Sequence, residues 1–233
     1  MKQTIRFTLN FIILLVVFQP SAAQTCFGLE IKKGSGYEIA SYNAKGKLQS
    51  KSIYTFKEVK KEKDFTVIDI EMENFSSKGK SEGKNTYSAK CNGEKLIVDN
   101  MSMMTSEQLK SMEDFNMTFS GKGLERPASF KVGDKLPNAT MTGKGNSSSL
   151  DVTFELNITN RKVDSQQQLT TPMGSFNSYK ITADLDTKIV TVIPVKLEYQ
   201  IVSYISPGQI WELRTETYRK GKLMGYSELV RTF

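Results

Sequence analysis

The sequence predicts an all-β protein: a single antiparallel, strongly curved sheet that forms a barrel or half-barrel, with one short helix. Three observations predict this fold. Apolar and polar residues alternate strictly over long stretches, which places the apolar side chains on one face of each strand. Tight-turn sequences separate these stretches. A helical pattern occurs at one place only, so a mixed α/β topology has almost no support.

The segment Leu150–Ile158 is the clearest strand. Its apolar members point one way and its polar members the other. The apolar set is Leu150, Val152, Phe154, Leu156 and Ile158. A strand that continues to Arg161 would be about 40 Å long, since each residue adds ~3.4 Å. Sheets of such strands twist and coil, and a barrel or half-barrel is the natural result.

The earlier part of the domain also has the pattern of strands. The expected strands are Tyr37–Tyr42, Ser52–Val59, Phe65–Met72, Thr86–Cys91 and Glu94–Asn100. The charged run Lys57–Asp64 is interpreted as a hairpin tip and Ser76–Lys84 as a loop. Asn92-Gly93 is a turn signal, because both residue types tolerate positive φ. The consecutive apolar residues from Leu96 to Val98 indicate a central strand.

The helix is expected to begin near Thr105. The sequence Thr105-Ser-Glu-Gln108 fits a capping box, and Leu109 and Met112 follow at helical spacing. Four methionines gather around it: Met101, Met103, Met104 and Met112. Because methionine fills irregular gaps, ordinary packing of the helix end against the sheet is the favoured interpretation, and a pliable binding lip is the alternative.

From Gly121 to Ser149 the chain loses its periodicity, which predicts a loop region with a short strand at Ala139–Thr142. Phe115–Ser120 precedes this region as a further strand. The strands expected after it are Leu150–Arg161, Val163–Leu169, Phe176–Asp186, Val192–Tyr204, Ile210–Tyr218 and Leu223–Thr232.

Residues 1–23 are predicted to be a signal peptide, which leaves residues 24–233 as a single domain. Lys2 and Arg6 form a positive n-region, Phe11–Phe18 is a short apolar core, and Ser21–Gln24 supplies small residues for cleavage. A bilayer span needs ~20 apolar residues, and this core is shorter. A single N-terminal anchor is the alternative, and no transmembrane span is expected after processing.

Cys26 and Cys91 are the only cysteines. An oxidising compartment favours a disulfide between them, and two free thiols with Cys91 buried are the alternative. Closing a loop of this length stabilises by about 4 kcal/mol in the chain-entropy model. Lipidation of Cys26 is disfavoured, because Thr25 stands where Gly, Ala or Ser normally precedes the modified cysteine.

The chain contains no histidine, which excludes Ser-His-Asp triads, Cys-His dyads and histidine-ligated zinc. Neither Gly121-Lys-Gly123 nor Gly143-Lys-Gly145 has the spacing or the strand-to-helix setting of a phosphate loop. No cofactor and no metal site are therefore indicated. The net charge of +7 is spread over turns rather than gathered on one face with stacking aromatics, so no nucleic-acid partner is expected.

Catalysis would therefore depend on carboxylates. Asp184 and Asp186 share a face by alternation, and so do Glu212 and Glu216. A glycosidase needs two carboxyl groups ~5 Å or ~6.5–9.5 Å apart in a cleft. A solvated face with Arg214 between the two glutamates is the favoured interpretation, and no catalytic residue is assigned. A His-free hydrolase of envelope or extracellular glycans is the alternative function.

The apolar face of the sheet is the expected binding surface. Its aromatic residues are the candidate ligand-lining residues: Phe154, Tyr179, Tyr199 and Trp211. Alternation places Leu213 on the same face as Trp211, and Glu212 on the wet face. The expected partner is an apolar small molecule, a lipid or an envelope protein, held by a non-catalytic binding or scaffold module.

Several segments resemble one family. They are Phe130–Pro137, Asn160–Val163, Thr170–Phe176 with Tyr179–Ile181, Leu213–Leu229, and Cys91–Gly93 with Ile97–Asp99. The chain resembles the exported TapB-like group of Bacteroidetes, close to domain-of-unknown-function family 3108. The resemblance covers most of the mature chain, but its motifs are turns and strand starts, so no site residue is carried over.

The resemblance implies an exported protein, periplasmic or extracellular, with a peripheral position at the outer membrane as a further option. The family more often has Gly-Leu-Val before the last hairpin, whereas this chain has Gly208-Gln-Ile-Trp211. Trp211 is therefore expected to alter the wall of the binding face locally.

Overall fold

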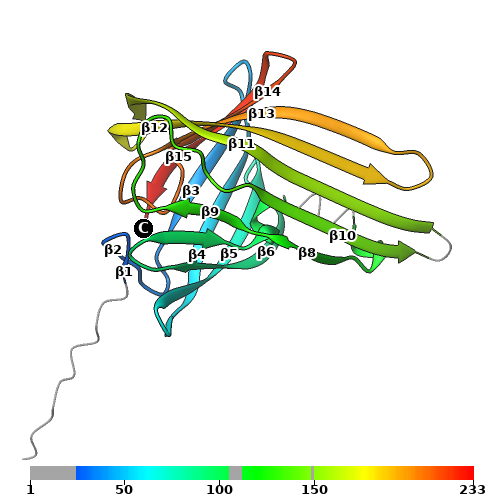
Figure 1. Cartoon of the computed structure of the whole chain (residues 1–233), viewed down its shortest axis with the longest axis horizontal. Helices are drawn as coiled ribbons and strands as arrows, with labels where there is room; N and C mark the ends of the chain where they lie inside the picture. The colour runs from blue at the N-terminus through cyan, green and yellow to red at the C-terminus, as the bar shows by residue number, and fades with distance from the viewer. Residues whose placement is uncertain (1–24, 105–111, 148–149) are drawn as a thin grey trace, which may run out of the picture.

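A computed structural model describes residues 25–104, 112–147 and 150–233. In this part of the chain the all-β prediction is confirmed. Thirteen strands form one antiparallel sheet that nearly closes into a barrel, and a two-stranded sheet lies beside it (Figure 1).

The small sheet pairs β1 (Thr25–Cys26) with β2 (Leu29–Glu30). The first strands of the large sheet are β3 (Gly36–Asn43), β4 (Leu48–Glu62), β5 (Phe65–Ser76), β6 (Ser81–Cys91) and β7 (Lys95–Val98). Two 3-10 turns follow, η1 (Asn100–Met103) and η2 (Glu113–Phe115). The remaining strands are β8 (Thr118–Lys122), β9 (Leu124–Pro127), β10 (Ala139–Ser147), β11 (Leu150–Thr171), β12 (Gly174–Val190), β13 (Val195–Ile205), β14 (Arg214–Arg219) and β15 (Lys222–Thr232).

The order of strands in the sheet brings the two ends of the domain together. The order is β8-β10-β11-β12-β13-β14-β15-β3-β4-β5-β6-β7-β9. In the middle of this sheet β15 pairs with β3, with Tyr226 opposite Tyr42. The consecutive apolar residues of β7 have neighbours on both sides, β6 and β9, although β7 lies only one strand from the edge.

The sheet nearly closes where its two edge strands meet. β8 and β9 are consecutive in the chain, and Gly123 alone separates them. A Cβ atom at Gly123 would overlap the carbonyl oxygen of Val98, and one at Gly121 would overlap that of Thr140. Gly121-Lys-Gly123 is therefore the place where backbone segments approach closely at this seam, a common role of glycine in strands.

The prediction for residues 121–149 is wrong in part: the strand expected at Ala139–Thr142 is present but extends to Ser147 as β10, and the expected loop also contains β9. β10 lacks an apolar pattern since Gly143 and Gly145 occupy positions where apolar side chains would stand. The ring of Phe119 and the side chain of Met117 cover Gly143 instead. Phe119 is also the register partner of Gly143 on β8, so the neighbouring strand supplies the missing apolar surface.

The two strands predicted around Arg161 are one continuous strand, β11. Register shifts between Thr159 and Lys162, and again near Val163, mark β-bulges rather than a turn. The charged run after Phe56 likewise remains in β4 up to Glu62, and Lys63, with φ of 53°, makes the turn. The loop predicted after Ser76 is a short turn, because β6 begins at Ser81.

Three clusters of buried apolar side chains form the core. Val152, Phe154 and Leu156 are buried, as the alternation predicted. Phe154 and Leu156 pack in one cluster with Met104, Met112 and Met141. This contact fits the packing interpretation of the methionines. The helix predicted from Thr105 falls on residues 105–111 and lies outside the described part.

The disulfide between Cys26 and Cys91 is confirmed. It joins β1 to the end of β6, with the two Cα atoms 5.7 Å apart. Both cysteines are fully buried beside Ile31 and Phe56. Because its sulfur is in a disulfide, Cys26 cannot carry a lipid thioether in this state. Among the helices of the described residues, none is both long enough and apolar enough to cross a membrane.

Candidate binding site in the barrel interior

Three adjoining cavities lie in the interior of the curved sheet. Their volumes are about 240, 230 and 260 Å³, and Ser102 of η1 lines all three. We name them the aromatic, the aliphatic and the serine-rich cavity. Small-molecule sites commonly have volumes of ~300–1,000 Å³, so adjoining cavities of this size can together hold a small ligand.

The aromatic cavity has a wall of stacked rings. Tyr37 on β3 and Tyr54 on β4 are register partners, which places their rings parallel with centroids 4.5 Å apart. The ring centroid of Trp211 lies 5.3 Å from that of Tyr37, with the two rings tilted. Burial raises the pKa of Tyr37 and of Tyr87, and raises that of Tyr54 to about 12. These phenols are therefore neutral at physiological pH.

The aliphatic cavity is lined mainly by apolar side chains on the inward face of β11, β12 and β13. They are Leu156, Ile158, Ile181, Ala183, Leu185, Ile201 and Ile205, with Leu124 of β9 and Met103 of η1. Alternation along each strand turns every second side chain inward, and this produces the continuous apolar surface. Arg161, Glu212 and Thr215 line both this cavity and the aromatic one.

Two arginines are buried at the junction of these cavities. The side chain of Arg126 on β9 is 5% exposed and that of Arg161 on β11 is 6% exposed. Arg126 donates from Nη2 to the carbonyl of Gln209, while its Nε has no hydrogen-bond partner. Arg161 donates from Nη1 to the carbonyls of Glu125 and Pro137. The acceptors of both guanidinium groups are thus backbone oxygens.

Burial lowers the pKa of Arg126 to about 10, although Glu212 and Tyr37 act in the opposite direction. Burial also lowers the pKa of Arg161, opposed by Glu212 and Glu125. A group with a pKa of about 10 is protonated at pH 7, so Arg126 remains a cation inside the protein.

Glu212 faces the interior, which corrects the prediction that it lies on the wet face. The strand β14 begins only at Arg214, so the alternation that was extended back through Glu212 does not apply. Glu212 lines both cavities and accepts a hydrogen bond from the hydroxyl of Thr215. Glu216 does not share this face, because its carboxylate belongs to a network on the opposite side of β14.

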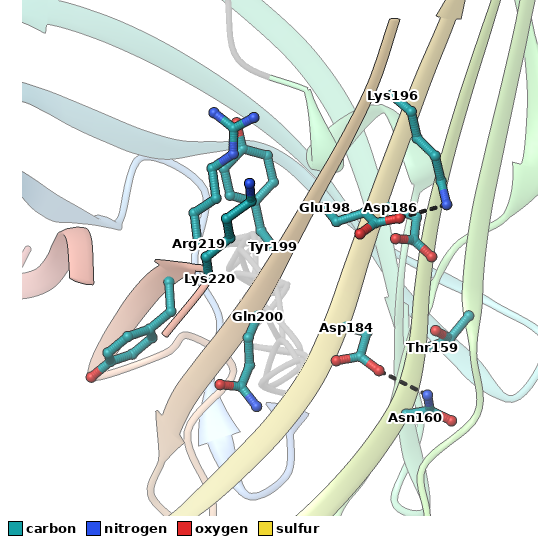
Figure 2. Close-up of a pocket in the computed structure, with 11 residues that line it drawn as sticks. Thr159, Asn160, Asp184, Asp186, Lys196, Glu198, Tyr199, Gln200, Arg219 and Lys220 are labelled. Atoms are coloured by element: carbon teal, nitrogen blue, oxygen red, sulfur yellow. Dashed lines mark hydrogen bonds and ion pairs between the residues drawn. The ribbon is translucent and has the colours of Figure 1, made fainter. Parts of the chain in front are cut away.

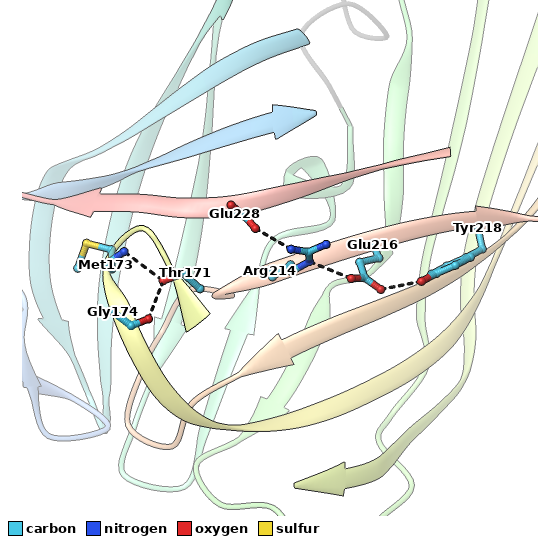
Figure 3. A network of polar contacts seen from close by, with 7 residues as sticks. All are labelled: Thr171, Met173, Gly174, Arg214, Glu216, Tyr218 and Glu228. Carbon is cyan, nitrogen blue, oxygen red and sulfur yellow. Dashed lines mark hydrogen bonds and ion pairs between the residues drawn. The ribbon is translucent and has the colours of Figure 1, made fainter. Parts of the chain in front are cut away.

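That network joins two strands, β14 and β15, on the face opposite the cavities (Figure 3). Arg214 donates from Nε to Glu216 at 2.8 Å and from Nη1 to Glu228 at 2.7 Å. The hydroxyl of Tyr218 donates to the second oxygen of Glu216 at 2.8 Å. The Arg214 guanidinium also lies over the ring of Tyr226, 4.1 Å from its centroid. This arrangement satisfies the charges of the outer face within the sheet itself.

Asp184 and Asp186 lie in a different place, an outer groove of about 650 Å³ (Figure 2). Asp184 accepts a hydrogen bond from the side-chain amide of Asn160 at 2.8 Å. Lys196 in the same groove forms an ion pair with Glu198 at 2.6 Å. The groove is predominantly polar. No group of three or more His, Cys, Asp or Glu residues suited to a metal ion occurs in the described segments.

The four aromatic residues expected to line a ligand lie in different surroundings. Trp211 lines the aromatic cavity. Phe154 is fully buried in the methionine-rich cluster, and Tyr179 packs against Phe130 with ring centroids 5.5 Å apart. Tyr199 lines the outer groove, where the guanidinium of Arg219 lies 5.8 Å from its ring centroid.

The inward positions of Arg126 and Arg161 were not predicted from the sequence. In β11 the buried residues are even-numbered up to Leu156 and odd-numbered from Arg161, because the bulge at Thr159–Lys162 shifts the alternation by one residue. Asn160, with φ of 52°, is at that bulge, but an asparagine is a weak signal for one. Arg126 lies on a four-residue strand, too short for a pattern.

Comparison with known proteins now places the chain. The DUF3108-like family matches residues 32–229, which is most of the sequence. The chain belongs to the DUF3108-like family. A search of the curated proteins finds no match for this DUF3108-like chain.

Two solved structures are similar to this DUF3108-like protein. One is described as a putative exported protein with a YmcC-like fold from Bacteroides fragilis, with 18% identity and a TM-score of 0.68 over 87% of this chain and 96% of that one. The other is described as a putative lipoprotein from Parabacteroides distasonis, with 20% identity and a TM-score of 0.72 over 90% of this chain and 99% of that one. At these identities the similarity establishes the fold.

Proposed function

We propose that this protein is an exported, non-catalytic binding module of the cell envelope, and that the interior of its barrel holds an apolar or amphipathic small molecule. The observation that carries the proposal is the set of adjoining cavities, one lined by stacked aromatic rings and one by aliphatic side chains. Ligand sites are typically concave and mostly apolar, with a few polar groups placed among the apolar ones.

Export is supported by several observations. The N-terminal segment has the composition of a signal peptide. The buried disulfide is of a kind that persists in oxidising compartments. The similar proteins are described as exported and as a lipoprotein. We infer a periplasmic or extracellular location, and we retain the TapB-like resemblance as part of this proposal.

The test uses Trp211, the only tryptophan of the chain, as a reporter inside the cavity. The processed protein is titrated with the neutral fluorophore N-phenyl-naphthylamine, and energy transfer from Trp211 is measured. Saturable transfer is expected. In Ala183→Phe the new ring enters the aliphatic cavity, and affinity should fall by about tenfold, the effect of ~1.4 kcal/mol.

Ala44→Phe is the matched control, since Ala44 lies in the exposed turn between β3 and β4. It adds the same side chain outside the cavity and should leave the affinity unchanged. Absence of saturable energy transfer in the wild-type protein would overturn the proposal. The protein would then be expected to act as a scaffold that docks an envelope protein partner. Equal loss of affinity in both variants would also contradict an interior site.

A further inference from the structure

We propose that the interior site is selective for a ligand with one carboxylate on an aliphatic chain, and that Arg126 and Arg161 bind the carboxylate. The inference rests on the proposed function and specifies the chemistry of its ligand. It is based on the charges and hydrogen bonds at the junction of the aromatic and aliphatic cavities.

The first observation is the incomplete hydrogen bonding of Arg126. Its Nε is buried and has no acceptor, and its side chain lines the aromatic cavity. A buried donor without a partner loses its hydration without compensation, and the loss is larger for a charged group. Nε–H and an Nη–H of one guanidinium form the fork that binds a carboxylate through both oxygens. An anionic ligand would supply the acceptor that Nε lacks.

The second observation is the imbalance of charge in the interior. Among the described residues, neither Arg126 nor Arg161 takes part in an ion pair, because their acceptors are backbone carbonyls. Glu212 is the acidic residue that lines the same two cavities, and it accepts from Thr215. Arg214 also borders the aromatic cavity, but its guanidinium belongs to the network on the opposite face of β14, where Glu216 and Glu228 neutralise it. Two buried cations therefore face one carboxylate, and a second carboxylate would restore the balance.

The third observation concerns the rest of the ligand. Arg161 lines the aliphatic cavity together with nine apolar side chains, so a chain attached to the bound carboxylate can extend along β11, β12 and β13. The serine-rich cavity offers no cation for the head group, since Glu82 is the charged residue that lines it. The arrangement thus separates a cationic end from an apolar end, as a single-chain carboxylic acid requires.

The experiment compares dodecanoic acid with its methyl ester, which has the same chain without the charge. Binding to the processed protein at pH 7.5 is measured by calorimetry and by the fluorescence of Trp211. The acid is expected to bind at least about tenfold more tightly than the ester. Dodecylamine, with the opposite charge, is expected to bind more weakly than the ester. These three titrations need no variant, so they remain decisive whatever happens to the stability of a mutant.

Arg126→Gln removes one cation from the site and should lower the affinity for the acid to that for the ester, with the ester unaffected. Arg219→Gln removes an arginine from the exposed outer groove and should change neither affinity. Equal affinities of acid and ester in the wild-type protein would overturn the carboxylate assignment and leave the apolar binding site intact. If neither compound binds and N-phenyl-naphthylamine also fails to bind, the proposed function itself is wrong.

Discussion

Arg231 and Glu38 are 193 residues apart in the sequence, yet Nε of Arg231 donates to the carboxylate of Glu38 at 2.7 Å. Lys51 binds the other oxygen of that carboxylate at 3.0 Å. The three residues belong to β15, β3 and β4, which are neighbours in the sheet. Glu38 is buried, whereas both cations are about half exposed. One carboxylate thus holds together strands from the two ends of the domain.

This carboxylate should make stability depend on pH. Burial by itself would raise the pKa of Glu38, but the hydrogen bonds from Arg231 and Lys51 outweigh it and lower the pKa below its ordinary value. A lowered pKa in the folded state means that the stabilisation is present at neutral pH and is lost as pH falls through the acidic range. We expect Glu38→Gln to lower the free energy of unfolding by about 1–2 kcal/mol at pH 7.

The measurement is urea denaturation of the wild-type protein and Glu38→Gln between pH 7 and pH 3. The difference between the two should shrink toward acid, because the wild-type carboxylate also becomes uncharged. Glu62→Gln is the control, since Glu62 is exposed at the end of β4. A difference that stays constant over this range would refute the role assigned to the ionised form of Glu38.

Gly123→Ala should destabilise the protein at the seam. The added Cβ would overlap the carbonyl oxygen of Val98, and forced overpacking typically costs about 1–3 kcal/mol. Gly93→Ala is the matched control, because a Cβ there has no neighbouring atom within 4 Å. Chemical denaturation of both variants measures the effect. Equal stabilities would show that the backbone at Gly123 can move away from Val98 to accept the methyl group.

Removing the disulfide should lower stability without changing the fold. Cys26 and Cys91 are 65 residues apart, and opening a loop of this length costs about 4 kcal/mol in the chain-entropy model. The double variant Cys26→Ser, Cys91→Ser is compared with the wild-type protein in urea, with and without reductant. Reductant should shift the transition of the wild-type protein only. An unshifted wild-type transition would contradict the stabilising role of the bond.

Phe154→Ala should destabilise far more than Tyr199→Ala. Phe154 is fully buried among methionines, and a large-to-small change in such a place costs about 3–5 kcal/mol. Tyr199 is half-buried in the outer groove, and its replacement by Ala should lower the free energy of unfolding by less than about 1 kcal/mol. Thermal or urea denaturation separates the two. Comparable losses would mean that the outer groove is part of the core.

The sequence was sufficient for the strands whose pattern is simple. Residues 150–158 alternate without interruption, and the buried positions of β11 up to Leu156 follow that pattern. The cysteine pairing followed from there being only two cysteines. A local alternation pattern and the number of cysteines can both be read directly from a single sequence.

The candidate site was not predictable in the same way. Arg161 turns inward because a bulge shifts the alternation, and Glu212 because the strand starts two residues after it. Arg126 lies on the edge strand β9, and it reaches the loop carbonyl of Gln209 only because the sheet curves and brings this edge close to that loop. These positions depend on irregularities and on contacts between distant segments, which leave no periodic signal in the sequence.

The pairing of β15 with β3 has a consequence for how the molecule is made. A chain that emerges gradually from a ribosome or a translocation channel can form hairpins early, such as β4 with β5. Its third strand, however, waits for a partner that is synthesised last. Contacts so remote in sequence form late and slowly. The edge of β3 that receives β15 therefore stays unpaired until the last strand of the chain arrives.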